Sequence, residues 1–301
     1  MRFRYESGME DESHSLETVE TSLGPVGLTR TGTGSPVLFV HGSPGGWDSS
    51  LAMGRFLVEG GHELIAPSRP GYPGTPLAGL ESIDRQADLH AALLDALGIE
   101  SAGLISWSGG GPSAYRLAVR HPDRVSALVA FASVSQKYVP PKAGIDERLI
   151  ENTSFGNWIL KFMTRHAPKS TVSSTLAAEG DLSREQLKAL VQEAMEDEHQ
   201  REVVLTMADV VADHKNREAG LENDMARFGE IEDLQLEKIG APTLVIHGSA
   251  DTDVPPDHGR RAADRIPGAR FLGMEAGTHL SLFVHPECRR VQEDALDLIA
   301  E

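Results

Sequence analysis

The sequence predicts an α/β fold, a doubly wound and mostly parallel sheet with an inserted helical cap. Two observations indicate this fold class. Apolar runs typical of strands buried on both faces, such as residues 36–42 and 125–134, alternate with stretches of helical periodicity. The alternation stops over residues 137–235, which are rich in helix-forming stretches, and it resumes with the strand APTLVIHG at 241–248.

The elements of the sheet follow in chain order. Residues 19–34 contain two short strands around a turn at Gly24-Pro25, and the strand at 36–42 leads through a glycine-rich loop to a helix near 49–59. Further strands are expected at 62–68, 102–108, 125–134, 241–248 and 269–274, and further helices at 82–98, after 108, at 257–266 and at 286–300.

This pattern divides the chain into two predicted domains. The core domain comprises residues 1–136 and 236–301, and the cap domain comprises residues 137–235. The insertion is too apolar in places for a disordered linker, for example in WILKFM at 158–163. Four apolar side chains of this segment could line a substrate pocket, and they equally fit the interior of the cap. They are Trp158, Leu160, Phe162 and Met163.

Composition and charge narrow the possible partners. The 301 residues are 40 % apolar and 24 % charged, as in ordinary globular proteins. The formal net charge of −17 would repel phosphate backbones, so nucleic acid is not an expected partner.

No stretch approaches the roughly 20 apolar residues of a membrane helix, and the polar start of the chain lacks the apolar core of a signal peptide. The single cysteine, Cys288, excludes an internal disulfide and is expected in the last helix, so a cytoplasmic location is the default prediction.

Ser108 is the candidate nucleophile, in the sequence SWSGG at 106–110, where a strand meets a helix. A sharp turn of this kind lifts a side chain clear of the sheet edge and points the first helical N–H groups at the space above it. Small residues are needed two positions before and after the nucleophile. Ser106 and Gly110 meet this need, although the usual pattern has glycine at the first position. Ser106 is a poor alternative nucleophile, because Leu104 stands two residues before it.

The loop HGSPGG at 41–46 is the candidate oxyanion hole. A tetrahedral intermediate needs two backbone donors that are fixed in place before the reaction. One is the N–H of Gly109, which follows the nucleophile. The other is the N–H of Ser43, because Pro44 has no N–H to offer. His41 is expected to bond within the loop and to be structural.

Asp251 and His279 are the candidate acid and base. Asp251 follows the strand TLVI and would share a sheet edge with Ser108, while Asp253, the alternative, falls where an apolar residue is usual. His279 stands in a glycine-bearing loop after the last strand and can reach over the sheet edge. His285, which precedes a proline, is typical of a helix start. The order Ser, Asp, His, each after a separate strand, fits a catalytic triad.

With these motifs the chain resembles the α/β-hydrolase superfamily over roughly residues 17–301. The resemblance is carried by VLFVHGSPGG, SRPGYPGTP, SWSGGGPSAYRLAVRHPDRV, APTLVIHGSADTDVP and GTHLSLF. It implies a helical cap between the sixth and seventh strands, no metal and no organic cofactor. Epoxide hydrolases and dehalogenases of this superfamily carry aspartate at the nucleophile position. This chain has Ser108 there, so the resemblance implies acyl transfer to water.

The predicted function is cleavage of a small-molecule carboxylic ester through an acyl-enzyme intermediate. Two further reactions stay open, because carbon–carbon bond hydrolases and proline iminopeptidases have similar loops. An aminopeptidase would need acidic cap residues to hold an amine, and the candidates also fit a solvated helix face. They are Glu193, Glu196, Asp197 and Glu198. A non-catalytic binding protein on the same fold is the third alternative, and the oligomeric state is not indicated by the sequence.

Overall fold

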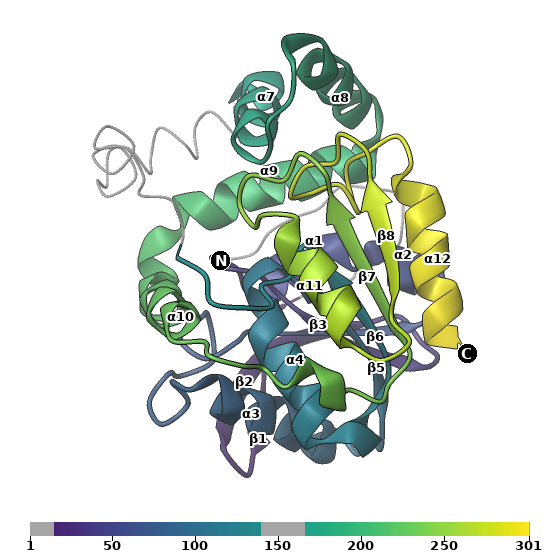
Figure 1. Ribbon diagram of the computed structural model, residues 1–301. Helices are drawn as coiled ribbons and strands as arrows, with labels where there is room; N and C mark the ends of the chain where they lie inside the picture. Colours follow the sequence, from purple (N-terminus) through teal and green to yellow (C-terminus); the bar gives the residue numbers. More distant parts are fainter. Residues whose placement is uncertain (1–14, 140–165, 301) are drawn as a thin grey trace.

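The computed structural model describes residues 15–139 and 166–300, and its centre is an eight-stranded sheet (Figure 1). The strands lie in the order β1-β2-β4-β3-β5-β6-β7-β8. Their bounds are β1 Glu17–Thr21, β2 Gly24–Thr31, β3 Pro36–Val40, β4 Glu63–Pro67, β5 Ala102–Trp107, β6 Val125–Phe131, β7 Thr243–Gly248 and β8 Arg270–Met274. The β1–β2 and β2–β4 pairs are antiparallel and all other pairs are parallel, which confirms the predicted mostly parallel sheet.

The first hairpin turns earlier than predicted. Its turn lies at Ser22-Leu23, and Gly24 and Pro25 open β2 instead. The reason is Thr21, whose hydroxyl donates to the carbonyl of Gly24 at 2.7 Å and accepts the N–H of Leu23 at 3.1 Å. A threonine hydroxyl thus closes the turn that the glycine-proline pair was expected to form.

The helix predicted near 49–59 is two helices, α1 (Trp47–Met53) and α2 (Arg55–Glu59). They are separated by Gly54, where an added Cβ would lie 2.6 Å from the side chain of Leu64 in β4. The close approach of helix and strand therefore explains why glycine stands at this break.

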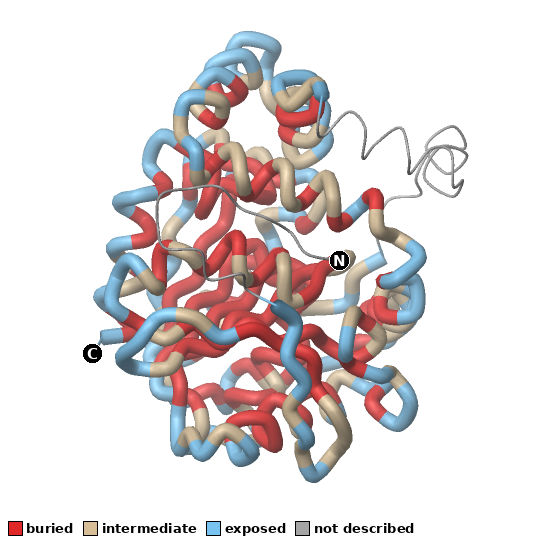
Figure 2. Tube along the Cα trace, turned by 180° about the vertical axis from the view of Figure 1, so that it is seen from behind, coloured by how far each residue is buried: buried red, intermediate tan, exposed pale blue. Residues whose placement is uncertain are grey.

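Helices cover both faces of the sheet (Figure 1). The helices α1, α2 and α12 (Cys288–Ala300) pack on one face, and α3 (Ile83–Ala96), α4 (Gly111–Arg120) and α11 (Asp257–Arg265) pack on the other. Figure 2 shows the result, a buried centre with the exposed residues on the outer turns. Cys288 is the first residue of α12, the last helix, as expected, and it is buried.

Four helices of the insertion lie over the carboxyl ends of the parallel strands (Figure 1). They are α7 (Pro168–Ala178), α8 (Arg184–Glu196), α9 (Glu198–Ala212) and α10 (Glu218–Gly229). Apolar residues of α7, α8 and α9 join the core on the side of α1 and α12. The division at residues 137 and 235 stays a prediction, and the four apolar residues at 158–163 lie outside the described residues. Within the described ranges no helix has both the length and the apolar character that crossing a bilayer requires.

Candidate active site

Ser108 lies on the turn between β5 and α4, with a backbone φ of 54°. This left-handed conformation is uncommon for a residue with a side chain, and strain of this kind concentrates at functional sites. The Ser108 residue is only 8 % exposed. In the part of the chain that the structure describes, no hydrogen bond engages its hydroxyl. The oxygen is therefore not committed to a structural contact.

Two glycines let the loop after β3 pack against this turn. A Cβ on Gly42 would lie 2.8 Å from Cβ of Ser108 and 2.7 Å from the Trp107 ring. A Cβ on Gly110 would lie 2.3 Å from the carbonyl oxygen of Val40. Any side chain at either position would push the 41–46 loop away from the serine.

Ser106, where glycine is usual, is accommodated inside β5. Its Oγ lies 2.9 Å from Oγ of Ser133, and the Ser133 hydroxyl also lies 3.1 Å from the carbonyl oxygen of Ser106. The backbone of Ser106 is not in the left-handed region, so the serine imposes no strain there. Because its hydroxyl is bonded to Ser133, the departure from glycine leaves no unpaired polar group at this buried site.

The imidazole of His279 is paired with the carboxylate of Asp251. Nδ1 of His279 lies 2.8 Å from Oδ2 of Asp251, and both residues are buried. Oδ1 of Asp251 accepts the backbone N–H groups of Asp253 at 2.9 Å and of Val254 at 3.0 Å. The same Oδ2 lies 3.2 Å from Nε2 of His247. These contacts lock the carboxylate and direct Nε2 of His279 away from it.

Charge and burial oppose each other in this pair. Burial would raise the pKa of Asp251, but the His279 charge and the hydrogen bonds from His247 and His279 hold the pKa well below its usual range. Burial would lower the pKa of His279, but the Asp251 carboxylate outweighs it and raises that pKa above its ordinary value. The site thus stabilises an imidazolium, the species that forms when the base takes a proton.

Trp107, the residue directly before the nucleophile, contacts the loop that carries His279. Its indole Nε1 donates to the carbonyl of His279 at 3.1 Å, and the two ring centroids are 5.2 Å apart. The three residues Ser108, Asp251 and His279, predicted from separate stretches of sequence, thus lie at one edge of the sheet. No hydrogen bond between Ser108 and His279 is present among the described residues, and such bonds are often long before a substrate is bound.

The two alternatives for the acid and the base have other partners. The Asp253 carboxylate faces Glu179, whose pKa its charge raises, and among the described residues no hydrogen bond joins it to His279. His285 accepts the N–H of Glu287 through Nδ1 at 3.1 Å, and its Nε2 lies 3.0 Å from the carbonyl oxygen of Glu275. His285 thus supports the turn before α12, as its position ahead of a proline predicted.

The predicted oxyanion donors are neighbours. A Cβ on Gly109 would lie 2.1 Å from Oγ of Ser43, and within the described residues the N–H of Ser43 makes no backbone hydrogen bond. His41 holds the loop, as expected. Its Nδ1 lies 2.7 Å from the carbonyl oxygen of Gly42 and its Nε2 accepts the N–H of Arg69 at 2.8 Å. Burial and then the Arg69 charge lower the pKa of His41, so the ring is neutral.

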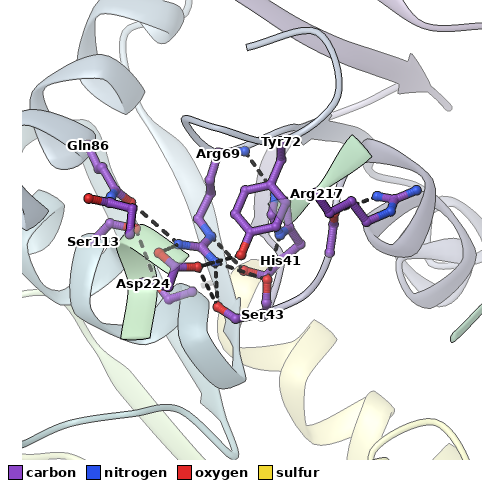
Figure 3. A network of polar contacts seen from close by, with 12 residues as sticks. His41, Ser43, Arg69, Tyr72, Gln86, Ser113, Arg217 and Asp224 are labelled. Atoms are coloured by element: carbon purple, nitrogen blue, oxygen red, sulfur yellow. Dashed lines mark hydrogen bonds and ion pairs between the residues drawn. The ribbon is translucent and has the colours of Figure 1, made fainter. Parts of the chain in front are cut away.

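Sequence reasoning missed a buried ion pair next to this loop (Figure 3). Arg69, from the segment after β4, binds Asp224 of α10, and both side chains are buried. Arg69 stands in the quoted stretch SRPGYPGTP, which could have drawn attention to it. Asp224 had no such signal, because it stands among polar residues of a helix and looks solvent-facing in the sequence.

The acidic residues proposed for amine binding lie at the corner between α8 and α9. Asp197 caps α9 by accepting the N–H of Gln200 at 3.0 Å, and it pairs with Arg289 at 2.9 Å. Glu196 accepts from Gln192 at 3.0 Å. These contacts are those of a helix cap and a charged surface. Across residues 15–139 and 166–300, no group of three or more His, Cys, Asp or Glu side chains is arranged to hold a metal ion.

A family model described as the alpha/beta hydrolase fold matches residues 35–286. The chain belongs to this family. An alpha/beta hydrolase fold protein from Nakamurella multipartita has a similar structure, with 48 % sequence identity, a TM-score of 0.92, and 95 % of this chain and 99 % of that one covered. The resemblance and the fold class predicted from the sequence are therefore confirmed.

Two curated relatives of this α/β-hydrolase have named activities. A 2-hydroxymuconate semialdehyde hydrolase from Pseudomonas putida is 28 % identical over 85 % of this chain and 84 % of its own length. A pimeloyl-[acyl-carrier protein] methyl ester esterase from Aeromonas hydrophila is 27 % identical over 87 % of this chain and 95 % of its own. The relatives are hydrolases, and their reactions differ.

Proposed function

We propose that this α/β-hydrolase is a serine esterase that cleaves a carboxylic ester of a small molecule through an acyl-enzyme. Ser108 is the nucleophile, His279 the base, Asp251 its partner, and the N–H groups of Ser43 and Gly109 form the oxyanion hole. One observation carries the proposal. An uncommitted serine hydroxyl on a left-handed turn lies next to the loop of an imidazole that is paired with a buried carboxylate.

The chemistry follows from these roles. Oγ of Ser108 attacks the ester carbonyl while Nε2 of His279 takes its proton, and the carbonyl oxygen becomes an oxyanion held by the two N–H groups. Collapse of the intermediate breaks the bond to the alcohol, which leaves with the proton from His279. Water then attacks the acyl-enzyme and gives a proton to His279. The bond between the acyl carbon and Oγ of Ser108 breaks, His279 returns the proton to Oγ, and the carboxylic acid leaves.

The named activities of the two relatives support two candidate reactions, ester cleavage and carbon–carbon bond cleavage. The methyl ester esterase supports the ester, and its alignment covers 87 % of this chain and 95 % of its own. The semialdehyde hydrolase makes carbon–carbon bond cleavage the second candidate at almost the same identity. The aminopeptidase loses support, because Asp197 is engaged as a helix cap and in an ion pair and Glu196 accepts a surface hydrogen bond. We also propose that residues 137–235 act as the cap over the substrate.

The test begins with a fluorophosphonate probe, which labels activated serines. The wild type and the Ser106→Ala variant are expected to be labelled, and Ser108→Ala is not. Ser106→Ala is the matched control, because it removes a serine hydroxyl two residues away. Turnover of aryl esters should fall at least about 10³-fold in Ser108→Ala. Labelling that persists in Ser108→Ala, or no labelling of the wild type, would contradict the proposal. Turnover of 2-hydroxymuconate semialdehyde but of no ester would favour the second candidate.

A further inference from the structure

The hydroxyl of Ser43 is part of a buried polar network that reaches into the inserted helices (Figure 3). It donates to Oδ2 of Asp224 at 2.5 Å and accepts from Nη2 of Arg69 at 2.8 Å. Asp224 belongs to α10, and both charged partners are about 1 % exposed. A cap residue is therefore bonded directly to the residue whose N–H we assign to the oxyanion hole.

Arg69 and Asp224 form a two-pronged pair. Nη1 and Nη2 of Arg69 donate to Oδ1 and Oδ2 of Asp224 at 2.8 and 2.5 Å, and the Tyr72 hydroxyl adds a bond to Oδ2 at 2.6 Å. Charge-assisted bonds of this geometry are strong and directional. Because the pair is buried, removing the carboxylate would leave the guanidinium without its counter-charge. Asp224 therefore fixes where the Arg69 guanidinium lies.

The same guanidinium binds the backbone of the oxyanion loop. Its Nε donates to the carbonyl of His41 and its Nη2 to the carbonyl of Gly42, both at 3.0 Å. The carbonyl of Gly42 and the N–H of Ser43 belong to one planar, trans peptide unit, in which the two groups point in opposite directions. Holding the carbonyl on Arg69 consequently aims the N–H of Ser43 away from Arg69.

The helix that carries Asp224 is itself closely docked. The N–H of Gly220 donates to the carbonyl of Gly71 at 3.1 Å, and a Cβ on Gly220 would lie 2.4 Å from the Tyr72 ring. Such close backbone contact leaves α10 little room to shift relative to the segment that holds Arg69. The position of Asp224 is thus set by backbone packing as well as by its own hydrogen bonds.

We propose that Asp224 is a positioning residue for the oxyanion hole, which it controls through Arg69 and the Ser43 hydroxyl. The inference rests on the proposed function, and it makes helix α10 of the cap a part of the catalytic framework. In this role Asp224 touches no substrate. It keeps one backbone donor aligned for the developing oxyanion, where misalignment weakens transition-state binding more than ground-state binding.

The experiment compares Ser43→Ala, Asp224→Asn and the double variant with wild type, using kcat and KM for an aryl ester. A second readout is the affinity for a trifluoromethyl ketone, which forms an oxyanion on the enzyme, relative to the matching methyl ketone. We expect kcat to fall about 10-fold in Ser43→Ala and about 10²-fold in Asp224→Asn, with KM within about threefold. The affinity for the trifluoromethyl ketone, relative to that for the methyl ketone, should fall by the same factors. The double variant should lose no more than Asp224→Asn, because both substitutions act through one path.

Ser135→Ala is the matched control. It removes another buried serine hydroxyl, which donates to the carbonyl of His258 at 2.7 Å at the start of α11. It should lower Tm as Ser43→Ala does while kcat stays within twofold. If Asp224→Asn fails to fold, kcat and the relative affinity of Ser43→Ala for the two ketones still test the positioning role.

Three outcomes separate the explanations. An unchanged kcat and ketone ratio in folded Ser43→Ala would overturn the positioning role alone. If kcat falls in Ser135→Ala as well, and the loss in each variant is proportional to its loss of Tm, the effect is one of stability. That result would also overturn the positioning role. A wild type that neither takes the fluorophosphonate label nor turns over esters would overturn the proposed function, and the positioning role with it.

Discussion

Oδ2 of Asp251 lies 2.8 Å from Nδ1 of His279, while Oδ1 of the same carboxylate is held by two backbone N–H groups. The carboxylate is therefore immobile, and it determines the tautomer of the imidazole. Replacing it in Asp251→Asn leaves the shape but removes the charge that stabilises the imidazolium. We expect kcat for an aryl ester to fall by about 10³- to 10⁴-fold with little change in KM.

Asp253→Asn is the control for this prediction, because Asp253 was the alternative acid and has no bond to His279. Its kcat should stay within about tenfold of wild type. Comparable losses in the two variants would count against Asp251 as the partner of the base, as would full activity in Asp251→Asn.

The pH profile should follow the raised pKa of His279. The base must be neutral to accept the proton of Ser108, so kcat/KM should be low when the imidazole is charged and rise as pH increases. Because the Asp251 carboxylate raises this pKa, the midpoint is expected above 6.5. Asp251→Asn should move the midpoint downward. Rates measured from pH 5 to 10 in buffers of constant ionic strength check both statements, and a wild-type midpoint below 6.5 would contradict them.

The sequence predicted the strand-end motifs because each is local. Ser108, Asp251 and His279 each follow an apolar run, and parallel strands present their carboxyl ends at one edge, so their proximity follows from topology. Two elements differ slightly from their predicted bounds, and each difference has a local cause. Thr21 closes the first turn before Gly24, and Gly54 divides a predicted helix where Leu64 approaches.

The contacts of the inserted helices could not be predicted, because they join residues far apart along the chain. Asp224 and Arg69 are 155 positions apart, and their hydrogen bonds are buried. Asp224 directly follows Glu222 and Asn223, as a residue on the polar face of a surface helix would. Only the docking of α10 on the segment after β4 makes this aspartate a buried one.

Gly42→Ala should damage the site, because its Cβ would lie 2.7 Å from the Trp107 ring and 2.8 Å from Cβ of Ser108. The loop or the serine turn must move, so we expect kcat/KM to fall at least tenfold and the free energy of unfolding to fall by about 1–3 kcal/mol. Gly229→Ala is the matched control, since no atom lies within 4 Å of its added Cβ. Urea titrations and ester assays of both variants give the comparison. A Gly42→Ala enzyme with normal kcat/KM would show that the close packing is not needed.

Glu179, at the end of α7, should make stability depend on pH. Burial, and then the charge of Asp253, raise the pKa of its carboxyl to about 8, while His279 acts in the opposite direction and Asp251 adds to the rise. In the unfolded chain the group titrates near its ordinary value of about 4.5. Between these two values the folded protein holds a proton that the unfolded chain does not, so the free energy of unfolding falls as pH rises through that window.

Glu179→Gln removes this titration and keeps the size of the side chain. The Tm of the variant relative to wild type should therefore be higher at pH 8.5 than at pH 5, by about 2 °C or more. His279 titrates in both proteins, so its contribution largely cancels in the difference. Glu185→Gln, at an exposed position in the first turn of α8, is the control and should show no such trend. A Tm difference between Glu179→Gln and wild type that stays constant with pH would mean that the pKa of Glu179 is not raised in the folded protein.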